Sequence, residues 1–398
     1  MKRQATIGIL FLVVFVDLLG FGMVIPVMPI YAEHLGASEA ATGWLSTGYS
    51  LMQFVFAPIW GRLSDRVGRR PMLLLSIAMT AVAFLLYGLA ASFTVLLVSR
   101  LFAGAATANI AIAQAYVADV TTPEGRAKGL GMIGAAFGLG FGFGPAGGGL
   151  LAAHSLSTPG FVAAALSLVN LVGAFFLLPE PAQHAAAARK RGRFEALLAE
   201  LRKPGIRKLL VIFFVVTLAF SAMEATYAFL AQRHYGLDAK HVGWVFAYIG
   251  VIVVLVQGGL IGPLTRRFGE KKLLVAGAVL QAFSLASLPF ATGTPGLLLA
   301  TAPLALGSGL TSPSLSSFLS KFSRAEDQGG TLGIGQSASA LGRIFGPLSG
   351  TTSFSAWHAA PYLGGAALMG LGAAVAATVA IPPIGDAKPA RAEVEPAS

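Results

Sequence analysis

The chain has 398 residues, of which 55% are hydrophobic and only 11% charged. Because a soluble domain carries about 25% charged residues, this composition excludes a water-soluble globular protein and predicts an integral membrane protein. The net charge of +11 does not indicate nucleic-acid binding, since the basic residues are divided among short segments without an aromatic-interleaved module. With no cysteine and six histidines that lack ligand spacing, we expect neither a disulfide nor a metal site.

Twelve apolar stretches are long enough to cross a bilayer, because a helix of about 20 residues spans a hydrocarbon core of about 30 Å. The fold prediction is therefore an all-α membrane protein of twelve transmembrane helices, with an N-terminal bundle in residues 1–180 and a C-terminal bundle in 207–382. The stretches lie at 5–30, 40–60, 71–92, 94–118, 127–153 and 159–179, and at 207–231, 241–264, 272–291, 296–320, 329–351 and 358–381.

The two halves carry the same landmarks at nearly constant spacing, which predicts two pseudo-symmetric copies of one unit. Residues 61–70 recur in degenerate form at 262–271, 201 positions later. Two dipeptides keep almost the same register, namely Gly43-Trp44 with Gly243-Trp244 and Gly144-Pro145 with Gly346-Pro347.

Two segments fall outside the bundles. In the linker 181–206, a basic run is followed by Leu197, Leu198 and Leu201 at helical spacing. This pattern fits an amphipathic helix along the inner headgroups, or a plain solvated linker. The Pro-, Ala- and charge-rich tail 383–398 is expected to be disordered.

Basic residues predict the orientation. With both termini in the cytoplasm, 24 of the 28 Lys and Arg residues lie on the cytoplasmic side, and only Arg233 and Lys240 lie outside. The same residues are expected to contact anionic lipid headgroups. The first apolar stretch is too long for a secretory signal and lacks a small-residue cleavage site, so we expect an uncleaved span.

Four charged residues lie within the spans, where each costs at least about 2.5–3.5 kcal/mol at the bilayer centre. They are expected to face a wet central cavity or one another. A carboxyl group whose Arg contact forms and breaks can take up and release a proton. Asp17 and Glu224 are therefore the predicted proton-coupling residues, with Arg100 and Arg343 as their charge partners. The alternative is a set of fixed structural ion pairs.

Polar side chains at helical spacing give candidate substrate contacts on the same helices. Such residues also hold helices together in membranes, and that alternative stays open for each of them. The candidates are Tyr49, Gln53, Thr107, Gln114, Thr217, Ser221, Gln336 and Ser339.

Two glycine-containing motifs call for close helix contacts. In the loop 61–70, Gly61 and Gly68 permit close backbone approach, and Asp65 offers a carboxylate to a neighbouring helix N-terminus. The fifth stretch has glycines every four residues around one proline. A nucleotide-binding loop is excluded there, because no strand precedes the run and no Lys-Ser/Thr follows it. The two series are Gly134, Gly138 and Gly142, and Gly140, Gly144 and Gly148 around Pro145.

Together these features resemble the major facilitator superfamily, and within it the drug:proton antiporters of the tetracycline-resistance type. The resemblance rests on the 61–70 loop, Arg100, the Gly140–Gly148 run, and further positions in register. Those positions are Asp17 with Pro26 and Pro29, Gln53 ahead of Ala57-Pro58, Ala118-Asp119, and Gly346-Pro347.

The resemblance implies a cytoplasmic latch between the bundles. In it Asp65 meets the start of the eleventh span near Gln328, Arg66 or Arg69 pairs with Asp119, and Gly61 and Gly68 shape the loop. The alternative is that these Arg residues only fix topology. In the second half Arg266 replaces the aspartate, so the latch is expected to be asymmetric. The fifth helix, through Gly140, Gly144, Pro145 and Gly148, is expected to seal the seam between the halves.

The expected function is proton-coupled antiport that exports lipophilic drugs or related small molecules by alternating access. We expect a monomer in a bacterial inner membrane that contacts lipids, with no cofactor, no nucleic-acid partner and no enzymatic activity. Gln281 stands where tetracycline carriers would have an aspartate, which favours multidrug or lipophilic-cation efflux over tetracycline–magnesium. The alternatives are a lipid or glycolipid flippase, a proton-coupled uptake symporter and, less favoured, a non-transporting receptor.

Overall fold

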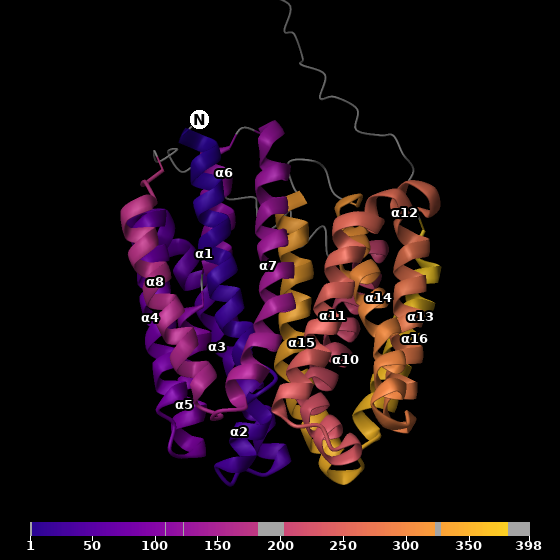
Figure 1. The fold of residues 1–398 in the computed structure, drawn as a ribbon. Coiled ribbons are helices and arrows are strands. Elements are labelled where there is room, and N and C mark those ends of the chain that lie inside the picture. The colour runs from indigo at the N-terminus through magenta and orange to yellow at the C-terminus, as the bar shows by residue number, and fades with distance from the viewer. Residues whose placement is uncertain (1, 108, 122, 182–202, 323–327, 381–398) are drawn as a thin grey trace, which may run out of the picture.

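The computed structural model describes the chain except residues 1, 108, 122, 182–202, 323–327 and 381–398 (Figure 1). In the described part every regular element is a helix. In the first half they are α1 Lys2–Val24, α2 Met28–His34, α3 Glu39–Val67, α4 Arg69–Gly88, α5 Phe93–Ala106, α6 Asn109–Val120, α7 Pro123–Ala152 and α8 Thr158–Leu177. In the second half they are α10 Pro204–Tyr235, α11 Ala239–Leu255, η1 Val256–Leu260, α12 Ile261–Phe268, α13 Glu270–Ser287, η2 Leu288–Phe290, α14 Gly293–Ser320, α15 Gln328–Ala356 and α16 Ala360–Thr378.

Within these residues eight helical segments are both long and apolar enough to cross a membrane. Helices α3, α14 and α15 have 28 or 29 residues, and so are also long enough, but contain more small and polar residues. The fourth predicted stretch is divided between α5 and α6. Each predicted stretch thus coincides with one helix or with consecutive helices of the described chain.

The first predicted stretch is not one continuous helix, and the expectation for 5–30 was wrong on this point. Helix α1 ends at Val24, and the seven-residue α2 begins at Met28. Pro26 lies in the break, where a proline cannot donate the backbone hydrogen bond that would continue the helix. The break places α2 beyond the end of α1 as a separate short element (Figure 1).

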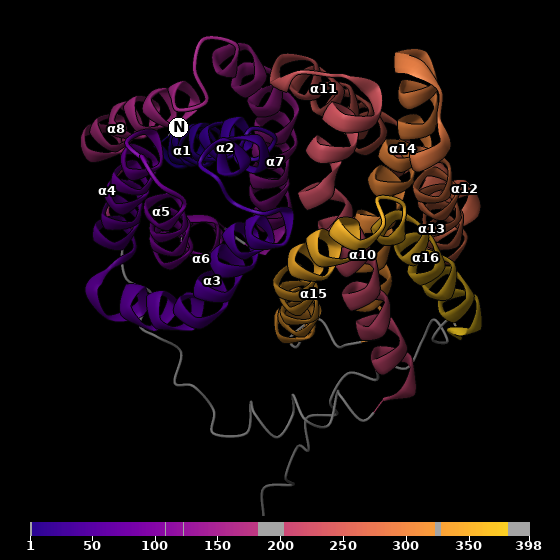
Figure 2. The same cartoon turned by 90° about the horizontal axis from the view of Figure 1, so that it is seen from below.

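The helices form two groups that lie side by side (Figures 1 and 2). In the first, α1 packs against α7 and α8, and α4 against α5 and α8. In the second, α10 packs against α15 and α16, and α13 against α14 and α16. The predicted linker helix and disordered tail lie almost entirely outside the described residues and stay predictions.

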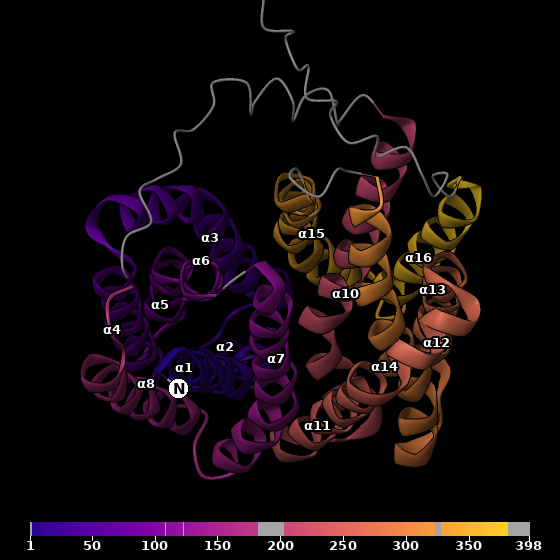
Figure 3. The same ribbon diagram turned by 90° about the horizontal axis from the view of Figure 1, so that it is seen from above.

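The groups meet through α3 with α15 and α7 with α11 (Figure 3). At one end of the molecule, glycines bring these backbones together: a Cβ atom added to Gly243 would lie 2.6 Å from the Pro145 carbonyl oxygen. A Cβ on Gly149 would lie 2.8 Å from the Ala239 carbonyl oxygen, and one on Gly43 would overlap Thr351. The Thr47 hydroxyl also donates to the Ile344 carbonyl at 2.8 Å. We call this the closed end.

Toward the other end the same helix faces separate. Along α7, residues seven apart share a face, and a Cβ on Gly138 would be 3.5 Å from Val254, whereas one on Gly131 would meet none of the described atoms within 4 Å. Along α3, Gly61 lies five helical turns after Gly43, and a Cβ added there would also meet no described atom within 4 Å. We call this the open end; it carries the start of α1 and the ends of α3 and α12.

The internal repeat extends to backbone detail. Ser38 and Asp238, 200 positions apart, both accept a hydrogen bond from the third residue of the helix they cap. Gly68 and Gly269, 201 apart, both have positive φ, at 119° and 76°. The two halves are thus built on one local plan.

Candidate functional site

The centre of the candidate site is the aromatic ring of Tyr49 on α3. Its side chain is 9% exposed, and its hydroxyl donates to the Thr107 hydroxyl at 3.1 Å. The guanidinium carbon of Arg100 lies 4.7 Å from the centre of the Tyr49 ring and 5.6 Å from that of Phe21. Arg100 is 2% exposed, so these cation–π contacts stabilise a charge removed from water.

Glycine makes this arrangement possible. A Cβ atom on Gly104, one turn beyond Arg100 in α5, would overlap the Tyr49 carbonyl group. Only a residue without a side chain lets α5 approach α3 so closely. The resulting short distance holds the guanidinium over the ring.

Tyr49 interacts electrostatically with charged groups from both bundles. Asp17 on α1, Arg100 on α5 and Arg343 on α15 all interact electrostatically with it. Glu224 on α10 interacts in turn with Arg343. Asp17 is 6% exposed, whereas Glu224 and Arg343 are half-buried. Arg100 thus lies directly on the Tyr49 ring, while Asp17, Glu224 and Arg343 act electrostatically on Tyr49 or on one another.

Glu224 and Arg343 are close enough to interact but are not locked together. No ion pair within 4.0 Å joins them in the described part of the chain. Their interaction can therefore strengthen or weaken as the two side chains change position. Such a variable contact is what a proton-exchanging carboxyl group requires.

Three of the predicted polar residues pack helices together, and the three glutamines keep part of their surface exposed. Thr217 donates to the Ser339 hydroxyl at 3.1 Å, and Ser221 packs where Gly346 approaches α10, so these three side chains hold α10 against α15. Their contacts match the helix-packing alternative. Gln53 is half-buried, and Gln114 and Gln336 are exposed.

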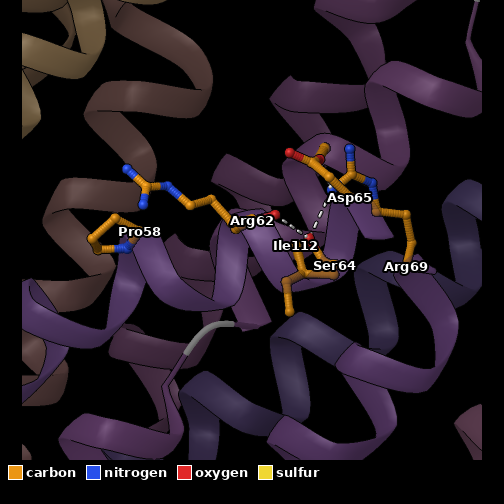
Figure 4. A pocket seen from close by; sticks show the side chains of 8 residues that line it. Pro58, Arg62, Ser64, Asp65, Arg69 and Ile112 are labelled. Carbon is orange, nitrogen blue, oxygen red and sulfur yellow. Dashed lines mark hydrogen bonds and ion pairs between the residues drawn. The ribbon is translucent and has the colours of Figure 1, made fainter. Parts of the chain in front are cut away.

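The loop after α3 forms an ion-pair network centred on Arg69. Its Nη1 lies 2.8 Å from Asp65 Oδ1, its Nε lies 2.9 Å from Asp119 Oδ2, and Nη1 also donates to the Ser64 hydroxyl at 2.7 Å. Ser64, Asp65 and Arg69 line a pocket of about 280 Å³ at the open end, together with Pro58, Arg62 and Ile112 (Figure 4). Arg66 is exposed.

The inter-bundle part of the predicted latch involves the start of α15. The structure brings together Arg69, Asp65 and Asp119 within the first bundle. Helix α15 begins at Gln328, whose side chain lies outside the described residues. The latch itself stays a prediction.

Glu180 completes this network and was missed from the sequence. Its two carboxylate oxygens accept from the backbone N–H groups of Arg69 and Arg70, at 2.8 and 3.1 Å. A carboxylate here satisfies the first N–H groups of α4 and complements the helix dipole. Gly68 is required beside it, because a Cβ there would lie 2.8 Å from Glu180 Oε1. Nothing local signals a partner more than 100 residues away.

The second half repeats the Arg69–Asp119 pair with the charges reversed. Glu270 stands 201 positions after Arg69, Lys321 stands 202 after Asp119, and their Oε2 and Nζ atoms lie 2.7 Å apart. The sequence showed only that Arg266 replaces the aspartate of the first loop. The second loop nevertheless has a carboxylate, because Glu270 supplies one a turn later. The register of the repeat could have found the pair.

Some glycines of α7 let it pack closely against α1, and others let it pack closely against α11. A Cβ on Gly140 or Gly144 would lie 2.6 or 2.8 Å from α1, and one on Gly148 would overlap the Met23 carbonyl oxygen. Glycines 342, 346 and 350 of α15 contact α10 in the same way, 202 positions later. The row predicted to seal the seam thus packs within its own bundle. Gly142, Gly149 and the carbonyl of Pro145 make the seam with α11.

Gln281, at the place of an expected aspartate, does not face the site. It is 1% exposed, and its amide donates to the Thr311 hydroxyl at 2.8 Å. A second hydrogen bond reaches the Gly277 carbonyl at 3.4 Å. Gln281 therefore joins α13 to α14.

Two of the helices that border the seam, α3 and the α11–η1–α12 helix, have an irregularity at the same register. Pro58 lies inside α3, and Gly259, 201 positions later, lies in the π-helical turn η1. Prolines and π-helical turns are the usual sites of helix bending, and π-turns concentrate at functional sites. Gln257 in this turn is exposed at the open end and was not predicted as a site residue.

Sequence comparison now identifies the fold. The chain matches the Major Facilitator Superfamily over residues 10–347 and 256–398. The chain belongs to this superfamily. It is 31% identical over 384 residues to Multidrug resistance protein 2 of Bacillus subtilis (strain 168), which covers 93% of this chain and 95% of that protein. It is 32% identical over 382 residues to the class C tetracycline resistance protein of Escherichia coli, covering 92% and 95%.

Solved structures of the superfamily show the same fold. The human organic anion transporter MFSD10 superposes with a TM-score of 0.71 at 24% identity, covering 94% of this chain and 99% of that one. A bacterial homologue of the human lysosomal transporter Spinster, solved in an inward-facing, unoccupied conformation, gives 0.73 at 15% identity, covering 95% of each chain. The prediction of a major facilitator fold is confirmed, and the chain is a multi-pass membrane transporter.

Proposed function

We propose that this transporter is a proton-coupled antiporter that exports lipophilic drugs or related small molecules by alternating access. One observation carries the proposal: Tyr49, which holds Arg100 over its ring and interacts electrostatically with Asp17 and with Arg343 of the other bundle, lies between an end where the bundles meet and an end where they separate. A site placed there is reached from one side at a time. The multidrug and tetracycline resistance proteins among its relatives support export as the direction.

The orientation follows from charge. The open end carries Arg62, Arg66, Arg69 and Arg70 as well as the start of α1, and so corresponds to the cytoplasmic side under the positive-inside rule. The helices are therefore arranged as in an inward-open carrier, with both termini in the cytoplasm of a bacterial cell. The predicted latch of Asp65 with the start of α15 would form when this end closes.

Proton exchange is assigned to Glu224 and Asp17. Arg343 near Glu224 favours its charged form, and withdrawal of Arg343 favours uptake of a proton. Rocking of the bundles changes how α10 and α15 meet the first bundle at Tyr49, and so links protonation to the direction in which the site opens. Arg100, fixed over the rings of Phe21 and Tyr49, serves as the constant charge of the site.

Substrate selection follows from the site walls. Phe21, Tyr49 and Phe141 form a continuous aromatic set, with ring centres 5.1 and 5.9 Å apart. Aromatic walls with few polar groups suit a lipophilic compound. Position 281 is a glutamine that is hydrogen-bonded to Thr311 in helix packing. The chain therefore offers no carboxylate there for a magnesium-bound tetracycline. We therefore propose multidrug export by a monomer in contact with lipids.

The test uses everted membrane vesicles acidified by respiration. Substrate addition should release protons from vesicles that contain the native protein, and not from those with Asp17→Asn or Glu224→Gln. Asp238→Asn is the matched control, because it removes an exposed carboxylate at the start of α11. Release that persists in both site variants would reject these residues as the coupling groups.

Two alternatives on the same fold predict other results. Accumulation of a solute by intact cells that collapses with an uncoupler would indicate uptake symport. Transfer of a labelled lipid between leaflets of proteoliposomes would indicate a flippase. Neither is favoured by a specific contact in the described residues.

A further inference from the structure

An ion-pair cluster joins the two bundles at the closed end. Arg233, near the end of α10, belongs to the second bundle, whereas Glu33 in α2 and Glu39 at the start of α3 belong to the first. Arg233 Nη2 lies 2.5 Å from Glu33 Oε1, and its Nη1 contacts Glu39 Oε1. One guanidinium is thus held by two carboxylates across the seam.

The cluster rests on an apolar contact. Helix α2 packs against α10, and Ile30 lies against the buried cluster that contains Tyr227 and Leu230. The Arg233 guanidinium carbon is 5.5 Å from the centre of the Phe229 ring. The Glu39 side chain is 16% exposed and that of Arg233 45%, so the pair is buried on the Glu39 side and open to solvent on the Arg233 side.

The sequence makes Arg233 unusual in its place. Only Arg233 and Lys240 are predicted among the basic residues at this end, against 24 at the other. Lys240 is exposed and forms no ion pair in the described part of the chain. Of Arg233 and Lys240, only Arg233 is paired within the described residues, and both of its partners belong to the opposite bundle.

These contacts exist in only one of the two states that alternating access requires. Glu33 and Glu39 move with the first bundle and Arg233 with the second, so opening of the closed end must break both pairs. An interaction present in one state alone shifts the equilibrium toward that state. We propose that Arg233, Glu33 and Glu39 form an outer gate that keeps the closed end shut.

To call this cluster an outer gate rests on the proposed function and on the proposed orientation in the membrane. The experiment that tests the gate measures opening of the closed end and needs neither. The chain has no cysteine, so a single introduced cysteine reports on one place. Thr47→Cys puts the reporter at the seam, where Thr47 is 4% exposed and bonded to Ile344. The rate of its reaction with a bulky maleimide is measured in purified protein in lipid nanodiscs, where both faces are accessible.

Removal of the gate should expose the reporter. In the Thr47→Cys background, Arg233→Gln and Glu39→Gln should each raise the labelling rate about three- to tenfold, the range expected for loss of a partly buried ion pair. Lys240→Gln, which removes one positive charge from the same face, should leave the rate unchanged. The combined exchange Arg233→Glu with Glu39→Arg should return the rate toward that of the parent.

The outcomes separate the gate from the transport function. Equal labelling of the Arg233→Gln and Lys240→Gln variants, or failure of the exchanged pair to lower the rate, would overturn the gate. Faster labelling of Arg233→Gln in a protein that exchanges no drug for protons would support the gate and contradict the proposed antiport. Size-exclusion profiles and the rescue by the exchanged pair guard against a variant that has merely misfolded.

Discussion

Replacement of one seam glycine by alanine should change which end of the carrier is open. A Cβ on Gly243 would lie 2.6 Å from the Pro145 carbonyl oxygen and 2.8 Å from the Gly149 Cα, both backbone atoms that no rotamer change can move. Overpacking of this kind costs about 1–3 kcal/mol, a factor of about 5 to 150 in an equilibrium. Because α7 and α11 separate when the closed end opens, the cost falls only on the closed state.

The matched control is Gly131→Ala on the same face of α7, where an added Cβ meets none of the described atoms within 4 Å. Both substitutions replace a helical glycine with alanine, so their intrinsic helix preferences are alike, and both gain about 0.5–1 kcal/mol from that source. Only Gly243→Ala adds the clash. A difference between the two variants therefore reports the seam itself.

Distances between spin labels give the measurement. Labels at positions 44 and 244, where two half-exposed tryptophans stand on α3 and α11, report the closed end. Labels at Val67 and Phe268, at the ends of α3 and α12, report the open end. Gly243→Ala should lengthen the first distance and shorten the second, and Gly131→Ala should change neither. Identical distance distributions in the two variants would refute the assignment of the seam.

Three further outcomes follow from particular contacts. Gln281→Asp should lower the free energy of unfolding by about 2–4 kcal/mol, because it buries a charge and loses the donor to Thr311. The measurement is a lower Tm, and an unchanged Tm would contradict the role of Gln281 in joining α13 to α14. Tyr49→Phe, which keeps the ring over Arg100, should retain most drug-dependent proton release, whereas Tyr49→Ala should abolish it; equal loss would assign the effect to the hydroxyl. The capping hydrogen bond from the backbone N–H lowers the pKa of Asp238, so its contribution is complete above the unfolded value near 3.8 and disappears as pH falls through the folded-state pKa. Asp238→Ala should therefore cost about 1 kcal/mol near pH 7 and progressively less in acid, as melts at several pH values would show.

Properties summed over many residues were predictable from the sequence. Hydropathy located the long membrane-crossing helices of the described chain, because burial of a whole segment in hydrocarbon outweighs any single side chain. The constant spacing of the repeat linked the two halves. The free-energy cost of a charged side chain in the bilayer led to the prediction that Asp17, Arg100, Glu224 and Arg343 face inward. Each of these inferences adds contributions along a stretch of chain and does not depend on one contact.

Pairings between distant residues could not be predicted in the same way. Glu180 caps a helix that begins 111 positions earlier, and no feature of its own segment reveals this. The importance of Tyr49 depends on Gly104, which lets two helices approach within backbone contact. The break after Val24 was visible as Pro26, but a proline within an apolar run is compatible with a kinked helix as well as with two helices.

Seam and bundle contacts show a related limit. The α7 glycines form two series on different faces, and sequence spacing cannot say which series faces the other bundle. The structure assigns Gly142 and Gly149 to the seam, and Gly144 to α1. The same row recurs in α15 against α10, so this packing is common to both halves.

The central claim is that drug binding and protonation compete through Glu224. The most direct test is proton release by purified protein in weakly buffered detergent solution as a lipophilic substrate is added. The native protein should release protons in proportion to bound substrate, and Glu224→Gln should bind substrate with markedly reduced release. Undiminished release from Glu224→Gln, at the same bound substrate, would contradict the account.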